Sequence, residues 1–262
     1  MSGLRLKWYG TATVLLEQDG TKLLFDPFIP LNKESYKPPL EELSESDGIF
    51  VTHCHFDHIS AIPSILKRCR EDVKVYCTRE PKDVLVSKGL DKSRIYNLKL
   101  GDVVNLDPFE VHILKGKHIV FDWLLILKTI FNLRVLTNLG SFVRVLKAKE
   151  HRRVPETIVC DIRVQNKRVL LLGSLNLDAG TEYGVGANLL VLPLQGRSDI
   201  CSYAIPFIDR LKPEKVLLDH IDDTFPPFSS PVKTEPFISH MEREYPAIPV
   251  ICRQASAEWI EL

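Results

Sequence analysis

The most constraining feature of the sequence is a histidine cluster directly after a short apolar run. The run GIFV (residues 48–51) is typical of a buried strand and is followed at once by THCHFDH (residues 52–58). Imidazole and carboxylate are the ligands that suit zinc and neighbouring first-row metals. An extended loop would point His53 and His55 to one side and turn the pair Asp57 and His58 toward a neighbouring position. The sequence therefore predicts two adjacent metal pockets.

Strand and helix patterns on both sides of the cluster indicate an α/β chain. Strand-like runs at the start are separated by the turn signal Asp19-Gly20 and form a predicted meander. A β-α-β rhythm follows and is repeated in the second half. The expected strands are 4–8, 13–17, 22–25, 48–51, 73–77, 103–106, 109–114, 157–164, 168–172, 189–192, 215–218 and 250–252, and the expected helices include 62–66, 81–88, 200–211 and 236–244. No linker divides the chain, so we expect one domain over residues 1–262.

Composition excludes several classes of function. Of the 262 residues, 45% are hydrophobic and 26% charged, which is typical of a folded globular protein. The 34 basic and 34 acidic residues balance, so no global positive field favours nucleic acid. An uninterrupted apolar run of about 18 residues is absent from the sequence, and a transmembrane segment is not expected. The six cysteines are dispersed and no secretory leader precedes them, so a cytoplasmic location is the expectation. The oligomeric state is not predicted.

Residues 119–149 depart from this rhythm. Apolar residues from Leu124 to Leu146 recur at gaps of three or four, which predicts a broad apolar helical face. The segment contains five basic residues and one acidic residue, a local excess of positive charge in a neutral chain. We expect a helical insert that either packs on the domain or forms an apolar lid beside the site. A lid of this kind would suit a hydrophobic or lipid-like ligand.

The HxHxDH signature resembles that of the metallo-β-lactamase superfamily of metal-dependent hydrolases. The runs WYGTA (residues 8–12) and LLFDP (residues 23–27), with the spacing of the later histidines, are most similar to the branch that contains ascorbate-6-phosphate lactonase. The resemblance implies a four-layer αββα sandwich of the α/β (α+β) class, with the helical insert at 119–149. It also implies that metal ligands come from loops along one edge of the sandwich.

The resemblance also implies a ligand set. His53 and His55 match the ligands of the first site, and Asp57 and His58 match those of the second. His220, which follows the strand-like run KVLLD (residues 215–219), would complete the second site.

The remaining ligand of the first site has two candidates. His118 follows the strand 109–114 and is preferred, whereas His112 lies inside that strand and is the alternative. Asp26, which closes an early strand, would orient a ligand histidine by accepting its distal N–H, or would simply be a turn carboxylate before Pro27.

One position departs from the family pattern. The superfamily usually ends a central strand with Gly-Asp, and that aspartate bridges both metals. Here the strand RVLLL (residues 168–172) is followed by Gly173 and Ser174. A neutral hydroxyl is a poor replacement for an anionic bridge. We therefore expect a weakened second site, a single retained metal, or compensation by Asp178 four residues later.

Taken with the resemblance, these residues predict a metal-dependent hydrolase that acts on a small molecule. A metal-bound hydroxide would attack an ester, a lactone or a phosphodiester. Asp57 and His220 are the expected catalytic residues, Asp57 as the proton acceptor. Zinc is the expected metal, with manganese as the alternative, at one or two ions per chain. Two other functions stay open: a non-catalytic metal- or ligand-binding descendant that lost turnover at Ser174, and a peripheral lipid hydrolase whose lid is residues 119–149.

Overall fold

The computed structural model describes residues 3–120, 140, 156–226 and 228–262. Its strands form two mixed sheets of seven strands each. The first sheet has the order β14 (Ile260–Glu261), β1 (Arg5–Trp8), β2 (Val14–Gln18), β3 (Thr21–Phe25), β4 (Gly48–Phe50), β5 (Lys74–Cys77), β6 (Ile95–Asn97). The second has the order β13 (Val250–Ile251), β12 (Val216–Asp219), β11 (Leu189–Pro193), β10 (Lys167–Leu172), β9 (Ile158–Val164), β8 (Phe109–Lys115), β7 (Val103–Leu106).

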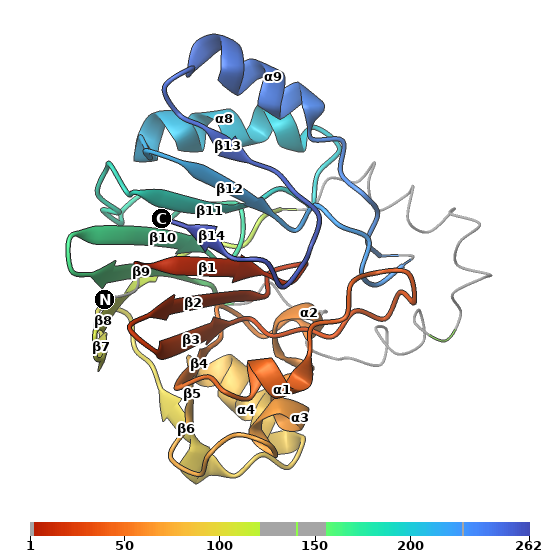
Figure 1. Cartoon of the computed structure of the whole chain (residues 1–262), viewed down its shortest axis with the longest axis vertical. Helices are drawn as coiled ribbons and strands as arrows, with labels where there is room; N and C mark the ends of the chain where they lie inside the picture. Colours follow the sequence, from red (N-terminus) through yellow and green to blue (C-terminus); the bar gives the residue numbers. More distant parts are fainter. Residues whose placement is uncertain (1–2, 121–139, 141–155, 227) are drawn as a thin grey trace.

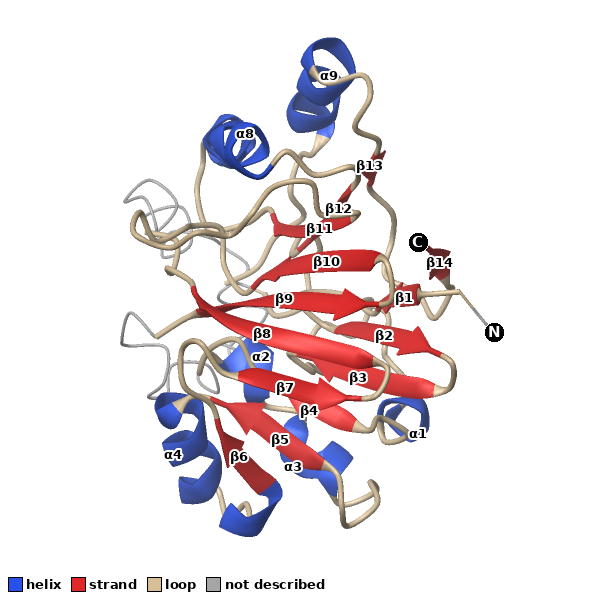
Figure 2. Ribbon diagram, turned by 90° about the vertical axis from the view of Figure 1, so that its left-hand side faces the viewer, coloured by secondary structure: helices blue, strands red, loops and turns tan. Residues whose placement is uncertain are grey.

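Helices cover the outer faces of both sheets, so the described residues form four layers (Figures 1 and 2). On the first sheet lie α1 (Leu40–Leu43), α3 (Ile62–Leu66) and α4 (Arg79–Ser87), and on the second lie α8 (Ile200–Leu211) and α9 (Glu235–Glu244). A short helix, α2 (Phe56–Ile59), follows β4, and a 3₁₀ turn spans Lys92–Arg94. The predicted αββα class is confirmed.

Alternation along the strands explains these layers. Leu217 of β12 lies in the cluster between the two sheets, whereas its neighbours Val216 and Leu218 pack under α8 and α9. In the first sheet Phe25 points between the sheets and Leu24 points toward the helices. Successive side chains of a strand face opposite sides, so the apolar runs read from the sequence are strands buried on both faces.

Strand direction brings distant loops to one edge of the sandwich. β3 and β4 are parallel, and β10, β11 and β12 are parallel to one another. β8 and β10 are both antiparallel to β9 and so share a direction. The carboxyl ends of parallel strands meet at the same edge of a sheet. The loops after β4, β8 and β12 contain the predicted ligands, and the loop after β10 contains Ser174.

The hairpin between β2 and β3 follows the predicted turn. Asp19 and Gly20 both have positive φ, at 51° and 89°, as a two-residue type I′ turn requires. The turn sets the register in which Gln18 pairs with Thr21 and Val14 with Phe25. This register places Phe25 in the intersheet core and brings Asp26 to the edge that carries the histidine cluster.

Two predictions from the sequence concern residues 52–58 and residues 119–149. The extended loop predicted for residues 52–58 continues only to His55, because Phe56–Ile59 is a helical turn that contains Asp57 and His58. The proposed insert 119–149 lies, apart from residues 119, 120 and 140, outside the described residues. Within the described part of the chain, no helix has the length and apolar character needed to cross a membrane.

Truncating a side chain between the sheets should destabilise the whole fold. Leu217 is fully buried there, so Leu217→Ala should lower the free energy of unfolding by about 2–5 kcal/mol. Leu100→Ala removes the same atoms from a side chain that is 43% exposed and should cost about 0.5 kcal/mol or less. Urea denaturation measures both, and equal losses would contradict the assignment of Leu217 to the core.

Candidate metal centre

Two buried triads of donor side chains meet at the edge where the strands end. The first triad contains His53, His55 and His118, and the second contains Asp57, His58 and His220. Within each triad the three donor atoms lie within 4.8 Å of one another. None of the six residues is more than 9% exposed. This spacing and chemistry suit a divalent transition metal in each triad.

The two triads are in contact with each other. The rings of His53 and His58, one from each triad, lie 3.8 Å apart between centroids. Within the second triad, the ring centroids of His58 and His220 are separated by 5.2 Å. Within the first triad, the ring centroids of His55 and His118 are separated by 4.6 Å. The arrangement resembles the pair of neighbouring pockets expected from the HxHxDH spacing.

Asp26 and Thr52 orient one histidine of each triad. Oδ2 of Asp26 lies 2.9 Å from Nδ1 of His58 and accepts the Thr52 hydroxyl at 2.5 Å. The backbone N–H of Thr52 donates to Oδ1 of Asp26 at 2.7 Å, and the Thr52 hydroxyl oxygen lies 3.1 Å from Nδ1 of His53. With Nδ1 engaged in this way, each ring presents Nε2 to the centre. The position of Asp26 is the one expected of an orienting carboxylate.

The other two loops orient their histidines in the same way. Nδ1 of His118 lies 2.7 Å from the carbonyl oxygen of Ile119, and Nδ1 of His220 lies 3.4 Å from Oε1 of Gln195. Each acceptor favours the tautomer that carries the proton on Nδ1 and leaves Nε2 free for a metal. The Nδ1 contacts of His53, His58, His118 and His220 thus favour Nε2 as the nitrogen that faces the centre.

Burial lowers the pKa of three histidines of the centre. Desolvation lowers the pKa of His53 far below its usual range, and the neighbouring histidines lower it further. The pKa of His118 is lowered by the same cause, and that of His220 falls to about 3. Desolvation raises the pKa of Asp57 to about 7. Neutral imidazoles are the form that binds metal, so burial of His53, His118 and His220 favours the binding of a cation.

Backbone strain is concentrated around this edge. Thr11, Asp26 and His220 all have positive φ, between 44° and 56°, a conformation that side chains with a Cβ rarely adopt. Each costs on the order of 1–3 kcal/mol. Asp222 accepts the Thr11 N–H at 3.0 Å, and the Thr11 carbonyl accepts the His220 N–H at 3.0 Å. These bonds fix the loop that carries His220 in its strained conformation.

Ser174 occupies the position where the family pattern has an aspartate. It is buried at the end of β10, and its hydroxyl oxygen accepts the backbone N–H of Ile119 at 3.0 Å. Gly173, before it, leaves no room for a side chain, because a Cβ there would lie 2.3 Å from Cβ of Thr52. The hydroxyl is therefore bonded to the residue after His118, and the glycine before Ser174 packs against Thr52.

The structure separates the alternatives left open by the sequence. His112 lies on β8 and contacts Glu110, outside both triads, whereas His118 lies beside His53 and His55. Asp178 forms an ion pair with Lys115 at 2.8 Å and accepts the N–H of Gly180. Asp178 is therefore engaged away from the triads. The assignment of His118 and the other five residues as metal ligands remains a prediction.

Sequence reasoning missed three residues that shape the centre. The hydroxyl of Thr52 contacts His53. The backbone carbonyl of Thr11 and the side-chain amide of Gln195 contact His220. Only Thr52 carried a local signal, because it directly precedes the histidine cluster. Thr11 and Gln195 are brought in by the packing of one strand end against another.

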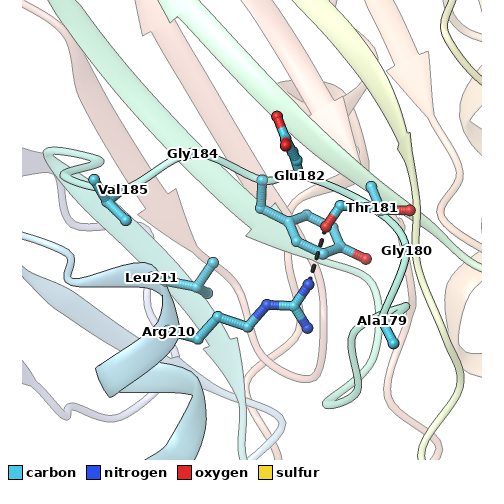
Figure 3. Close-up of a pocket in the computed structure, with 9 residues that line it drawn as sticks. Ala179, Gly180, Thr181, Glu182, Gly184, Val185, Arg210 and Leu211 are labelled. Carbon is cyan, nitrogen blue, oxygen red and sulfur yellow. Dashed lines mark hydrogen bonds between the residues drawn. The ribbon is translucent and has the colours of Figure 1, made fainter.

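A separate cavity lies under the loop after β10. Its volume is about 440 Å³, and it is lined by residues 179–185 and by Arg210 and Leu211 at the end of α8. Figure 3 shows Arg210 reaching across it toward Thr181, whose carbonyl oxygen accepts its guanidinium at 2.9 Å. None of the six donor residues lines this cavity, so donor geometry and not cavity size defines the candidate site.

Comparison with known sequences supports the resemblance to the superfamily. Residues 21–120 match a family model described as "Beta-lactamase superfamily domain", and this segment contains every donor residue of the triads except His220. A UPF0173 metal-dependent hydrolase of Pyrobaculum arsenaticum is 29% identical over 117 residues, which cover 44% of this chain and 51% of that protein. The chain thus spans about half the length of the relatives it matches.

Comparison with solved structures shows the fold. Igni18, described as a novel metallo hydrolase from Ignicoccus hospitalis, superposes with a TM-score of 0.65 at 18% identity, with complete coverage of both chains. The metallo-β-lactamase fold protein YhfI from Bacillus subtilis superposes with a TM-score of 0.68 at 13% identity, again over both whole chains. The architecture is therefore the metallo-β-lactamase fold.

Removing the charge of Asp26 should weaken the second triad selectively. Asp26→Asn loses the carboxylate that accepts from His58 and Thr52, and such orienting contacts are typically worth 10–100-fold in metal affinity. We expect that loss for the ion held by the second triad and a smaller one for the ion held by the first. Titration with Zn²⁺ measures both affinities. Asp83→Asn on the exposed face of α4 is the control, and an unchanged second affinity in Asp26→Asn would refute the orienting role.

The metal-free protein should gain stability at high pH when Asp57 is neutralised. The folded pKa of about 7 is above the unfolded value of about 4, so the native state binds the extra proton and loses stability as pH rises between them. Asp57→Asn removes this loss. In EDTA we expect its melting temperature to exceed that of the unaltered protein at pH 8 but not at pH 4. A difference of the same size at both pH values would contradict the shifted pKa.

Proposed function

Since the chain has the metallo-β-lactamase fold and residues 21–120 match the superfamily's domain, we propose that it is a metal-dependent hydrolase of a small-molecule substrate. The observation that carries the proposal is the meeting of two buried donor triads at one sheet edge. The names of the similar proteins, metal-dependent hydrolase and metallo hydrolase, support it.

The donor chemistry fits divalent metal ions. The first triad offers three imidazoles, and the second combines two imidazoles with the carboxylate of Asp57. Burial lowers the pKa of His53 and of His220, which favours their neutral forms. The Nδ1 contacts direct Nε2 inward. Zinc suits this set best and manganese is the alternative. Bound metal would supply activation of water and polarisation of the substrate oxygen.

The protein's own residues would orient the reaction and move the proton. Asp57 is the proposed proton acceptor, since its raised pKa of about 7 is near the value that suits a general base at neutral pH. His220, held by Thr11 and Gln195, would hold the second ion next to Asp57. The buried walls of the triads would exclude bulk water. The proposed substrates are an ester, a lactone or a phosphodiester.

One specific observation favours a second candidate function. Ser174 supplies no charge where the family pattern has a bridging aspartate, and Asp178 is engaged with Lys115. A protein that keeps metal or ligand binding without turnover would tolerate this change. The candidates differ in one respect: only the hydrolase converts substrate when metal is supplied.

Other expectations from the sequence stay as proposals. They are similarity to the ascorbate-6-phosphate lactonase branch, a cytoplasmic location, a single domain and a lipid-like ligand under the 119–149 insert. The role of the insert is tested by deleting residues 121–148 and comparing the hydrolysis of short-chain and long-chain esters by the shortened and the unaltered chain.

His118 and His112 provide a matched pair for testing the function. His118→Ala removes a donor of the first triad, so it should lower the metal content and reduce hydrolysis by at least about 100-fold. His112→Ala changes a histidine that contacts Glu110 and should leave both unchanged. Metal analysis and a panel of nitrophenyl esters, bis-nitrophenyl phosphate and a simple lactone, each with added Zn²⁺ or Mn²⁺, provide the measurements. Metal binding without turnover of any substrate would favour the non-catalytic candidate.

A further inference from the structure

Asp219 is a buried carboxylate with an oxygen that has no partner. It is the last residue of β12, directly before His220, and is 2% exposed. Among the described residues, Oδ1 of Asp219 is the only carboxylate oxygen that is fully buried and accepts no hydrogen bond. Burying a carboxylate in this way costs free energy unless a positive charge or a hydrogen-bond donor compensates it. Packing alone does not account for this residue.

Strand alternation places the side chain of Asp219 between the two sheets. Leu217, two residues earlier in β12, packs in the intersheet cluster, and residues two apart in a strand face the same side. Asp219 pairs with Pro193 at the end of β11, so it lies where these strands reach the edge that carries the triads. The carboxylate of Asp219 therefore faces the intersheet space at that edge.

Two neighbouring carboxylates act on Asp219, and both support the second triad. Burial raises the pKa of Asp219 well above its usual range, and the charges of Asp26 and Asp222 raise it further. Asp26 lies 2.9 Å from Nδ1 of His58 and already accepts two hydrogen bonds. Asp222 accepts the backbone N–H of Thr11 at 3.0 Å. These neighbours increase the cost of a negative charge on Asp219, and a cation beside it would reduce that cost.

The backbone holds Asp219 and His220 in a fixed relation. The peptide group between the two residues is bonded on both sides. The carbonyl oxygen of Asp219 accepts the N–H of Leu194 at 3.0 Å, and the N–H of His220 donates to the carbonyl oxygen of Thr11 at the same distance. Successive Cα atoms are about 3.8 Å apart. An ion bound by His220 would therefore lie within the range at which buried charges interact with little screening.

We propose that Asp219 supplies a negative charge that holds the ion of the second triad without coordinating it. This inference rests on the proposed function, and it concerns metal binding rather than turnover. Asp219 belongs to neither triad, so its effect on the ion is electrostatic. The donors of the second triad include one carboxylate, that of Asp57, so a divalent ion there keeps one positive charge that its donors do not balance. The carboxylate of Asp219 offsets that charge, and the ion offsets the cost of burying the carboxylate.

The proposal predicts opposite effects of Asp219→Asn on the metal-free and the metal-bound protein. In EDTA at neutral pH, the variant should have a higher melting temperature than the unaltered protein, because it loses a buried carboxylate that has no partner. The variant should also bind the second ion at least about tenfold more weakly, because a charge close to the ion is lost. A residue that only packs between the sheets would change stability without weakening the ion.

Chains that keep one triad show which ion Asp219 acts on. His118→Ala removes a donor of the first triad and leaves the second, and His58→Ala does the reverse. The Zn²⁺ affinity of each chain is measured by competition with a chromophoric chelator, with and without Asp219→Asn. The loss of charge should weaken Zn²⁺ binding at least about tenfold in the His118→Ala chain and less in the His58→Ala chain.

Binding of Co²⁺ separates electrostatic support from coordination. The visible absorption bands of Co²⁺ depend on the atoms that coordinate it and on their geometry. In the His118→Ala chain, Asp219→Asn should weaken Co²⁺ binding and leave the positions of these bands unchanged. Shifted bands would show that Asp219 is itself a ligand and would overturn the proposal.

Asp161 provides the matched control. It is also 2% exposed, but Arg163 and Arg168 contact its two oxygens at 3.0 and 2.6 Å. Asp161→Asn should therefore lower the melting temperature of the metal-free protein and leave the Zn²⁺ affinity unchanged. If Asp219→Asn does not fold, Asp219→Ala makes the same comparison with a smaller side chain. Failure of both variants to fold would contradict the expected gain in stability and overturn the proposal.

Three further results would overturn the proposal. They are an unchanged Zn²⁺ affinity after Asp219→Asn, equal losses in the two chains that keep one triad, and a lower melting temperature of the metal-free variant. All of these measurements are independent of turnover. Hydrolysis by a chain whose metal affinity does not depend on Asp219 would refute this inference and keep the hydrolase, whereas metal binding that depends on Asp219 without any hydrolysis would do the reverse.

Discussion

Thr52 is the residue on which the centre and the contact between the two sheets both depend. Its backbone N–H and hydroxyl donate to Asp26 at the end of β3, and its carbonyl accepts the N–H of Ile158 in β9 of the other sheet. Its side chain also fills the space that a Cβ on Gly173 would need. One buried threonine thus connects the ends of three strands from both sheets. His53 and His58, whose Nδ1 atoms lie 3.1 and 3.4 Å from the Thr52 hydroxyl, take their orientation from this junction.

Assembling the centre costs free energy, which apolar burial in the rest of the fold offsets. Five imidazoles and several carboxylates are buried together, and desolvation shifts the pKa values of His53, Asp57 and His220 away from their usual range. Strained backbone at Thr11, Asp26 and His220 adds to that cost. The apolar clusters between the sheets and under the helices supply the opposing stabilisation. Strain and burial of this kind are typical of functional sites.

The replacement of a bridging aspartate by Ser174 gives this centre its individual character. The proteins it resembles are named for metal-dependent hydrolysis, but fold likeness alone does not define a substrate. The hydroxyl is held by Ile119 and contributes a donor where the family pattern contributes a charge.

The sequence by itself determined the elements and most of the centre. Apolar runs and the Asp19-Gly20 turn predicted the strands, since local periodicity and turn chemistry depend on neighbouring residues. The HxHxDH spacing predicted four donors because they lie within six residues of one another. Only the tertiary structure places His118, and not His112, beside His53 and His55. It also pairs Asp178 with Lys115 and brings Thr11 and Gln195 to the loop of His220. Those relations join strand ends far apart in the chain, and they exist only once strand direction has gathered the ends at one edge of the sandwich.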